Sequence, residues 1–336
     1  MARSDAQRER GLRAVVSQGD VRQAIDAGEF VLHYQPIVDL ASDAACGVEA
    51  LLRWADPSGG LVPPGEFLPA IVHTPVMSAL TRWVLRAASA AAVAWPAWTV
   101  SVNVTARDVV RAAFVDEVTE AMSEAGLPPD RLIVELTETA LVQDLPRAAA
   151  TLTRLRALGV GVALDDFGTG YSSRLYLRDL PVTSIKIDQA FTSGVERSDD
   201  DRAIVTSLLE LAGATGLTAV AEGVERAGQL RTLRALGCPM AQGHLWSEAV
   251  PVADLRTAYR HRGSGLAAGR PRARPGRPVD ARVEERVADL LAQGASLHTI
   301  AAALNAAGLR TDRGTRWQST TVAYVIRDRR RGQPPG

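Results

Sequence analysis

The sequence predicts an α/β protein: a (β/α)8 barrel of the TIM type, followed by a small all-α domain of the helix-turn-helix type. Two observations predict the barrel. Short apolar β-rich runs alternate with longer helical stretches from residue 30 to about 250, and polar residues recur where those runs end. A third observation separates the small domain: after Tyr259 the pattern breaks into a stretch rich in Gly, Pro and Arg.

The predicted strands are short runs rich in β-branched and aromatic residues. In chain order they are VLHYQPIV, CGVEALLRW, TVSVNV, LIVEL, VGVALDD, SIKID, TAVAEG and MAQGHL. The helices expected between them span residues 79–94, 108–125, 144–158, 201–215 and 226–236, and each is followed by a helix-stopping Gly, Pro or Trp-Pro. Strands and helices that alternate in this way close into a barrel of parallel strands.

Composition divides the chain further. We expect a tail at 1–17, the barrel at 18–260, a basic linker at 261–282, a helical domain at 283–330 and a tail at 331–336. VEERVADLLAQ, LHTIAAALNAA and STTVAYVIRD are the three amphipathic helices predicted in the helical domain.

Charge is distributed unevenly along the chain. Between Arg262 and Gly336 there are 14 arginines and 6 acidic residues, a net charge of +8, which leaves −8 for residues 1–261. A basic end on an acidic body predicts two domains with different partners, and nucleic acid is a candidate for one of them. No stretch approaches the roughly 20 apolar residues of a membrane span, and the first residues lack the apolar core of a secretory signal. We therefore expect a cytoplasmic protein without a membrane partner.

Polar residues sit at or near the ends of the predicted strands, where a barrel of this type carries its functional groups. These residues are Glu49, Asn103, Glu135, Asp165, Asp166, Lys186, Glu222 and Gln242. Carboxylates within apolar strands are costly unless they are paired, hydrogen-bonded or bound to metal. Because the set is rich in oxygen and contains no His or Cys cluster, it suits Mg²⁺ or Mn²⁺, and the adjacent aspartates can serve two ions. Two such ions are the usual apparatus for cleaving a phosphodiester.

Lys186 is the one lysine among 38 basic residues. A phosphodiesterase site needs fixed positive charge near the water or the phosphate, and a compact ammonium supplies it where the planar guanidinium of arginine fits poorly. The isolation of Lys186 therefore favours a function, although a coincidence remains the alternative.

Eight segments together resemble the EAL domain of cyclic di-guanylate (c-di-GMP) phosphodiesterases. The segments are YQPIVDL, EALLRW, SVNVTA, VELTET, LDDFGTGYSS, IKID, AEGVE and QGHLWSEAV, and the resemblance covers about residues 18 to 260. DFG alone also occurs in protein kinases, but no kinase glycine loop or catalytic loop accompanies it.

The resemblance implies a role for each matching position. Metal ligands would be Glu49, Asn103, Glu135, Asp165, Asp166 and Glu222. Glu222 would act as ligand or base near the attacking water, beside Lys186. Substrate would be bound by Gln35, Arg53 and Gln242, with the alternative that Arg53 is a structural ion-pair partner. The resemblance also counts Glu138 among the catalytic residues. Together with the loop 166–173, Glu138 resembles the family's control loop, which links metal binding to a dimer contact. A homodimer is therefore expected.

The segment GASLHTIAAALNAAGLRTDRGTRWQSTTVAYVIRDR resembles the DNA-binding region of large serine recombinases. By this resemblance, Gln318, Thr320 and Thr321 begin a recognition helix, while Arg310, Arg313 and Arg316 would contact phosphates of double-stranded DNA. No recombinase catalytic domain precedes the segment, so recombination is not expected. The alternative is a basic protein-interaction domain.

Together these patterns predict an enzyme that uses two Mg²⁺ or Mn²⁺ ions to hydrolyse c-di-GMP to the linear dinucleotide pGpG, coupled to DNA binding. The alternative is a DNA-binding regulator that responds to c-di-GMP with little turnover.

Overall fold

The computed structural model describes residues 16–56, 60–95, 98–137, 144–168, 180–255, 281–292 and 297–309, together with Trp317 and Val322. The chain forms two compact units, residues 1–266 and 267–336. Over the described ranges, no helix has the length and apolar character needed to cross a membrane.

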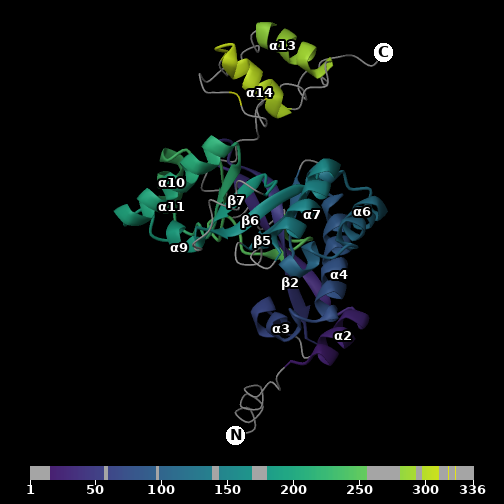
Figure 1. Cartoon of the computed structure of the whole chain (residues 1–336). Helices are drawn as coiled ribbons and strands as arrows, with labels where there is room; N and C mark the ends of the chain where they lie inside the picture. The colour runs from purple at the N-terminus through teal and green to yellow at the C-terminus, as the bar shows by residue number, and fades with distance from the viewer. Residues whose placement is uncertain are drawn as a thin grey trace. The chain divides into compact units, whose positions relative to one another are not determined.

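The first unit contains one sheet surrounded by helices (Figure 1). Its strands are β1 (Phe30–Asp39), β2 (Ala44–Ala55), β3 (Leu61–Val62), β4 (Thr99–Asn103), β5 (Leu132–Thr137), β6 (Gly161–Phe167), β7 (Ser184–Ile187), β8 (Thr218–Ala221), β9 (Met240–Gln242) and β10 (Val250–Pro251). Its helices are α2 (Gln18–Asp26), α3 (Pro64–Ile71), α4 (Pro75–Ala92), α5 (Ala106–Val109), α6 (Phe114–Ala125), α7 (Leu145–Leu158), α9 (Gln189–Thr192), α10 (Asp199–Thr215) and α11 (Ala227–Ala235), with a 3-10 turn at Pro129–Arg131.

The sheet closes into the predicted barrel. Its strand order is β10-β1-β9-β8-β7-β6-β5-β4-β2-β3, and an additional pairing of β1 with β2 completes the circle. Strands β2 and β4 to β9 pair in parallel. The two-residue strands β3 and β10, which the sequence patterns did not predict, pair with β2 and β1.

The barrel departs from a regular (β/α)8 arrangement at its first strand. β1 runs antiparallel to both β2 and β9. A chain can connect antiparallel strands by a short turn, whereas parallel neighbours need a crossover of a dozen or more residues. Only residues 40–43 separate β1 from β2, and Asp43 adopts a left-handed backbone with φ 56° in that turn. The short connection therefore makes β1 and β2 a hairpin.

The helix predicted over 108–125 is in fact two helices, α5 and α6. Thr105 caps α5 by accepting a hydrogen bond from the backbone N–H of Asp108, whose carboxylate accepts in return from the Thr105 N–H. The Asp108 carboxylate also accepts a 2.9 Å hydrogen bond from the Thr81 hydroxyl of α4. Asp108 is thus the third residue of a short capped helix, and not the start of a long one.

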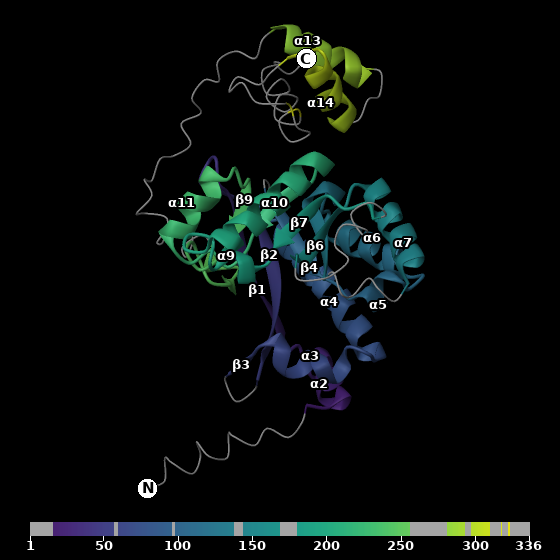
Figure 2. The same cartoon turned by 60° about the vertical axis from the view of Figure 1, so that its left-hand side comes forward.

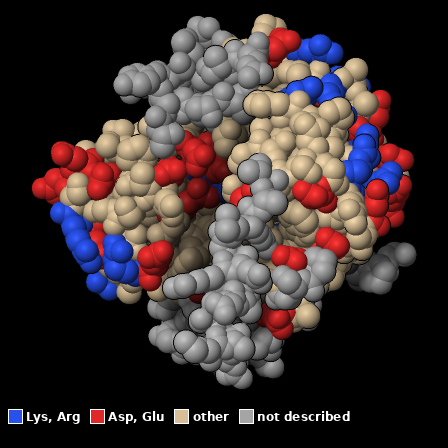
Figure 3. Space-filling view, turned by 90° about the horizontal axis from the view of Figure 1, so that it is seen from below, with Lys and Arg blue, Asp and Glu red and all other residues tan. Residues whose placement is uncertain are grey.

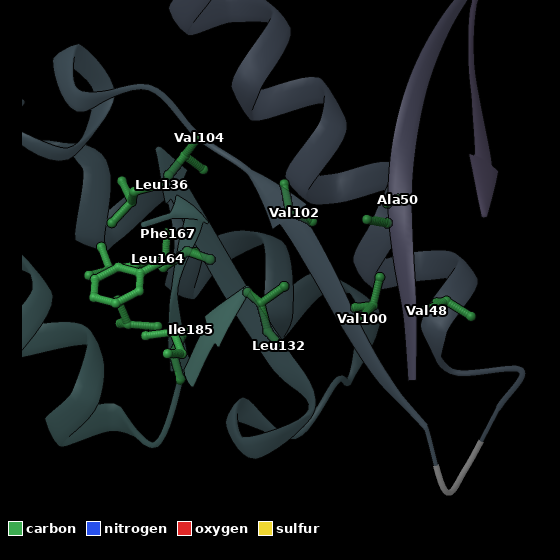
Figure 4. Packing of buried hydrophobic residues seen from close by; sticks show 14 of the residues in the cluster. Val48, Ala50, Val100, Val102, Val104, Leu132, Leu136, Leu164, Phe167 and Ile185 are labelled. Carbon is green, nitrogen blue, oxygen red and sulfur yellow. The ribbon is translucent and has the colours of Figure 1, made fainter. Parts of the chain in front are cut away.

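Alternation along the strands separates the core from the barrel interior. Val48 and Ala50 of β2, Val100 and Val102 of β4, and their equivalents on β5 to β7 face the helices and form the main apolar layer, part of which Figure 4 shows. The residues between them, such as Glu49, point the other way. The same period of two that builds the core therefore directs the polar side chains inward.

A smaller apolar cluster lies where β1 and β2 extend beyond the barrel. It packs side chains from α2, α3, β3 and the start of α4 around the far end of the hairpin, where Phe30 pairs with Trp54. Figures 1 and 2 both show α2 and α3 beside this end of the hairpin. Because β2 runs toward this cluster, the cluster lies on the side of the barrel where the parallel strands have their C-terminal ends.

The second unit contains α13 (Ala281–Ala292) and α14 (Leu297–Ala306), as predicted, while the third helix expected at 319–328 lies almost entirely outside the described residues. Its core joins Val283 and Val287 of α13 to Ile300 and Leu304 of α14 and to Trp317 and Val322. The Asn305 carboxamide forms two 2.8 Å hydrogen bonds with the Trp317 backbone, one to its carbonyl and one from its N–H. The unit therefore has a hydrophobic core of its own.

Candidate functional site

The C-terminal strand ends bring the predicted polar residues together inside the barrel. Residues from six strands converge there: Glu49 of β2, Asn103 of β4, Glu135 of β5, Asp165 of β6, Lys186 of β7 and Gln242 of β9. Strand register accounts for the convergence, since Asn103 lies beside Glu135 in the β4–β5 pair. Glu222 follows β8 directly and contacts the same group.

Lys186 is the centre of the group. Its ammonium nitrogen lies 2.8 Å from Glu135 Oε2, 2.8 Å from Glu222 Oε1, 3.1 Å from Glu49 Oε2 and 3.3 Å from Asp165 Oδ1, and its side chain is only 2% exposed. The sequence predicts this charge near the water or the phosphate. The ammonium lies among four carboxylates, including that of Glu222 beside which the resemblance places it, and a compact ammonium can contact all four at once.

Glu49 joins the carboxylates to a network of amide side chains. Its Oε1 accepts a 2.7 Å hydrogen bond from Asn103, and its Oε2 accepts one of 2.7 Å from Gln242. The Gln242 amide also donates to Oε1 of Gln35 at 2.8 Å, and Gln35 in turn donates to the carbonyl of Ser247. Gln242 is the last residue of β9, whereas the predicted strand MAQGHL continues beyond it. Its Oε1 is buried without a hydrogen-bond partner, and so has lone pairs to offer a ligand.

The carboxylates carry more negative charge than one ammonium can offset. Burial, together with the charge of neighbouring carboxylates, outweighs the attraction of Lys186 and raises the pKa of Glu222 to about 8 and that of Glu135 to about 7. Burial also acts to raise the pKa of Glu49, but Lys186 and the amide donors outweigh it and hold that pKa below its usual value. For Lys186, burial alone would lower the pKa, and the four carboxylates raise it well above its usual value. Additional positive charge would relieve this repulsion.

Asp165 and Asp166 both reach the site because the strand is irregular between them. Neighbouring residues in a regular strand point to opposite faces. Here the β6–β7 register shifts between Leu164 and Phe167, and Asp166 adopts φ 54°. Aspartate tolerates this left-handed conformation better than most residues do. One carboxylate oxygen each from Asp165, Asp166 and Glu222 consequently lies within 4.8 Å of the others.

Asp188 is a neighbour of the site that is absent from the predicted site residues, although it ends the IKID segment. Burial raises the pKa of Asp166 to about 6, with the charge of Asp165 and a hydrogen bond to Asp188 adding to the effect. Asp188 also caps α9 by accepting from the Ala190 N–H. The sequence feature that points to Asp188 is its position two residues after Lys186, at the end of the same predicted strand.

The face that carries the C-terminal strand ends has a hollow with acidic side chains gathered beside it (Figure 3). Next to the acidic group lies a mostly apolar cavity of about 780 Å³, whose lining includes Leu52, Leu68, Met77, Val84 and Asn103. Because Asn103 both lines this cavity and binds Glu49, the cavity adjoins the carboxylates.

Other predicted site residues have different outcomes. Arg53 lies four residues beyond Glu49 on β2, and its guanidinium donates a 2.7 Å hydrogen bond to the Leu52 carbonyl. Glu138 and most of the loop 166–173 lie outside the described residues. So do all the residues expected to contact DNA: Arg310, Arg313, Arg316, Gln318, Thr320 and Thr321.

Comparison with known proteins identifies the first unit. Residues 18–249 match the family model of the EAL domain. The chain belongs to the EAL family. Among curated proteins, MucR of Pseudomonas aeruginosa, a bifunctional diguanylate cyclase/cyclic di-GMP phosphodiesterase, is 40% identical to this chain over 241 residues. The alignment covers 70% of this chain and 35% of MucR. It is 38% identical over 256 residues to the cyclic di-GMP phosphodiesterase NbdA of the same organism, covering 75% of this chain and 33% of NbdA. The chain thus spans about a third of the length of these two relatives.

Solved structures share the EAL fold. The MucR phosphodiesterase in complex with c-di-GMP superposes with a TM-score of 0.67 at 40% identity, over 70% of this chain and 98% of that one. The EAL domain of Mycobacterium smegmatis DcpA superposes with a TM-score of 0.59 at 36% identity, over 70% and 97%. In the second unit, residues 278–331 match a family model described as Recombinase.

Proposed function

We propose that the EAL barrel hydrolyses c-di-GMP to pGpG with two divalent ions, Mg²⁺ or Mn²⁺. The observation that carries this proposal is the group of four carboxylates around Lys186, with Asn103 and Gln242 hydrogen-bonded to it, at the C-terminal end of a barrel. The MucR and NbdA relatives are named as c-di-GMP phosphodiesterases, which supports the same substrate here.

The residues present fit a pair of hard cations. The predicted ligands are oxygen donors, which Mg²⁺ and Mn²⁺ prefer. Asp165, Asp166 and Glu222 offer three carboxylate oxygens within 4.8 Å of one another. Glu49 and Glu135 contact the Lys186 ammonium, and Asn103 donates a hydrogen bond to Glu49. When bound, the ions would supply a nucleophile at neutral pH and offset the charge of the phosphodiester.

Glu222 is the carboxylate best suited to receive a proton from water. Among the four partners of Lys186 it has the most exposed side chain, 19% against 2% for Glu135. Lys186 would hold the Glu222 carboxylate in place through its 2.8 Å contact and limit the repulsion within the group.

Substrate would lie across the strand ends. Gln35 and Gln242, which hydrogen-bond to each other, offer amide groups at one side, and Arg53 offers positive charge further along β2. The apolar cavity beside Asn103 offers surface for a nucleobase. Glu138 completes the proposed catalytic set.

The deciding experiment is a hydrolysis assay. Purified protein is incubated with c-di-GMP and Mg²⁺ or Mn²⁺, and the nucleotides are separated by chromatography over time. We expect accumulation of pGpG, loss of the activity in excess chelator, and recovery on adding metal back. Absence of product with either ion would contradict the proposal.

We propose that the part of the chain after the barrel binds double-stranded DNA, with a basic linker at 261–282 and a DNA-binding domain at 283–330. Residues 1–17 and 331–336 are proposed to be terminal tails. The match of residues 278–331 to the recombinase model, the separate core around Trp317 and the net charge of +8 after residue 261 support this. The residues proposed to contact DNA are Arg310, Arg313, Arg316, Gln318, Thr320 and Thr321. We place the protein in the cytoplasm as a homodimer.

A second candidate is a DNA-binding regulator that senses c-di-GMP with little turnover. One observation favours it: Lys186 already pairs with four of the six expected metal ligands, and so partly supplies the charge that a metal would bring. If c-di-GMP changes the affinity for DNA while no pGpG forms, this candidate is correct.

A further inference from the structure

Gln229 is a buried carboxamide outside the acidic group. It is the third residue of α11, is 0% exposed, and forms four hydrogen bonds to backbone groups. Its Oε1 accepts from the N–H groups of Glu225 (3.0 Å) and Arg226 (2.8 Å), and its Nε2 donates to the carbonyls of Thr192 (3.0 Å) and Gly223 (3.3 Å). A carboxamide has two acceptor lone pairs and two N–H donors, so the side chain uses all of its hydrogen-bonding capacity.

The four hydrogen-bond partners of Gln229 lie on the segments that follow Lys186 and Glu222. Three of them belong to the connection between β8 and α11, which begins with Glu222. The fourth, Thr192, ends α9, which follows the strand that carries Lys186. Gln229 therefore joins the segment after Lys186 to the segment after Glu222, and α9 and α11 lie near each other in both views (Figures 1 and 2).

The chain at Glu222 needs this support because it leaves the sheet there. The Glu222 N–H makes the last ladder bond, 3.0 Å to the Ile187 carbonyl. The next residue, Gly223, adopts φ +65°, and a Cβ at that position would lie 2.4 Å from the Cβ of Gln189. Beyond this turn, the backbone is fixed by Gln229 and by a 3.1 Å bond from the Val224 N–H to the Gln242 carbonyl.

We propose that Gln229 is a positioning residue for Glu222. It fixes the backbone on the far side of the Gly223 turn, and so holds the Glu222 carboxylate against Lys186 and near Asp165 and Asp166. Other side chains of similar length would not do this. Glutamate would set a carboxylate oxygen against the Thr192 and Gly223 carbonyls, and methionine would make none of the four hydrogen bonds. The effect on hydrolysis rests on the proposed function, whereas the effect on metal binding does not require turnover.

The test compares the full-length protein with Gln229→Met and Gln229→Asn. Supporting residues of this kind typically change metal affinity or activity by about 10- to 100-fold. We expect Gln229→Met to lower kcat about tenfold or more and to raise the Mn²⁺ concentration for half-maximal rate by about tenfold. KM for c-di-GMP should stay within about threefold, because the four hydrogen bonds of Gln229 go to residues other than those proposed to bind substrate. Gln229→Asn keeps the carboxamide but is one methylene shorter, so its values should fall between those of the wild type and Gln229→Met.

The control is Leu233→Ala, which removes a buried side chain from the same helix and leaves the hydrogen bonds of Gln229 to the connection at 222–226 in place. This variant should lower Tm while leaving kcat and the Mn²⁺ requirement within about twofold, since its cost is a cavity in the core. Titration calorimetry with Mn²⁺ alone provides the second measurement. If the wild type does not hydrolyse c-di-GMP, a Kd for Mn²⁺ that rises about tenfold in Gln229→Met still supports the positioning role.

Two results would overturn the inference. One is a folded Gln229→Met protein with wild-type kcat and wild-type Mn²⁺ affinity. The other is a loss in Leu233→Ala equal to that in Gln229→Met, which would assign the effect to the stability of α11. If Gln229→Met does not fold, Gln229→Asn decides by the same two measurements.

Discussion

The ammonium of Lys186 lies 2.8 Å from the Glu135 carboxylate, although the two residues are 51 positions apart and belong to β7 and β5. With the contacts to Glu49, Asp165 and Glu222, this pair places one buried cation at the centre of the site. The sequence places Lys186 among the strand-end acids, and closure of the barrel brings its ammonium into contact with four of them.

Replacing a central carboxylate should abolish hydrolysis. We expect Glu49→Ala and Asp165→Ala to reduce the rate of pGpG formation by about 100-fold or more, because each loses a proposed metal ligand and a partner of Lys186. The exposed Glu120→Ala on α6 is the control and should keep wild-type activity. Undiminished turnover in either site variant would refute the assignment of the site.

Lys186 should not tolerate arginine. A planar guanidinium cannot approach four converging carboxylates as a point charge does, so we expect Lys186→Arg to lose about tenfold or more in kcat. Lys186→Met would leave buried carboxylates without their cation, and should lower the free energy of unfolding by about 3–5 kcal/mol in metal-free buffer. Chemical denaturation with and without Mn²⁺ measures this. Wild-type kcat in Lys186→Arg would show that the isolation of this lysine is a coincidence.

Gly223 should be sensitive to a single added methyl group. In Gly223→Ala the Cβ would meet Gln189 at 2.4 Å in a left-handed turn, so the segment carrying Glu222 must shift. Gly28 provides the matched control: it has φ +70° and open space around its missing Cβ, so Gly28→Ala should cost only the backbone strain of about 1–2 kcal/mol. We expect about a tenfold loss of kcat in Gly223→Ala alone. Equal activity in the two variants would show that the Gly223 turn does not position the site.

Residues 262–336 should bind double-stranded DNA and the barrel alone should not. If roughly five arginines contact phosphate, affinity should fall with salt with a log–log slope of about −4 to −5. Gln318→Ala or Thr321→Ala should change sequence preference at a similar slope, whereas Arg313→Ala should reduce the slope by about one. Anisotropy titrations of the fragment, of the barrel alone and of the full chain at two salt concentrations make the comparison. A helical fragment without salt-sensitive binding would indicate a protein-interaction domain.

The sequence by itself determined the barrel and most members of the site. The period of two places Val48 and Ala50 on one face of β2 and Glu49 on the other, and the polar strand ends identify one mouth of a barrel without any coordinates. These features depend on neighbours in the chain, and local patterns record them. The C-terminal helices α13 and α14 were predictable for the same reason.

Tertiary structure alone decided how these residues act together. Lys186 contacts Glu49 across 137 positions, and that contact depends on barrel closure, which no local period encodes. The hairpin that turns β1 antiparallel, the bulge that brings Asp166 beside Asp165, and the four hydrogen bonds of Gln229 likewise depend on partners supplied by other strands and helices. Sequence spacing specifies the face on which a side chain lies, but the distance between two side chains from different strands is set only when the sheet closes.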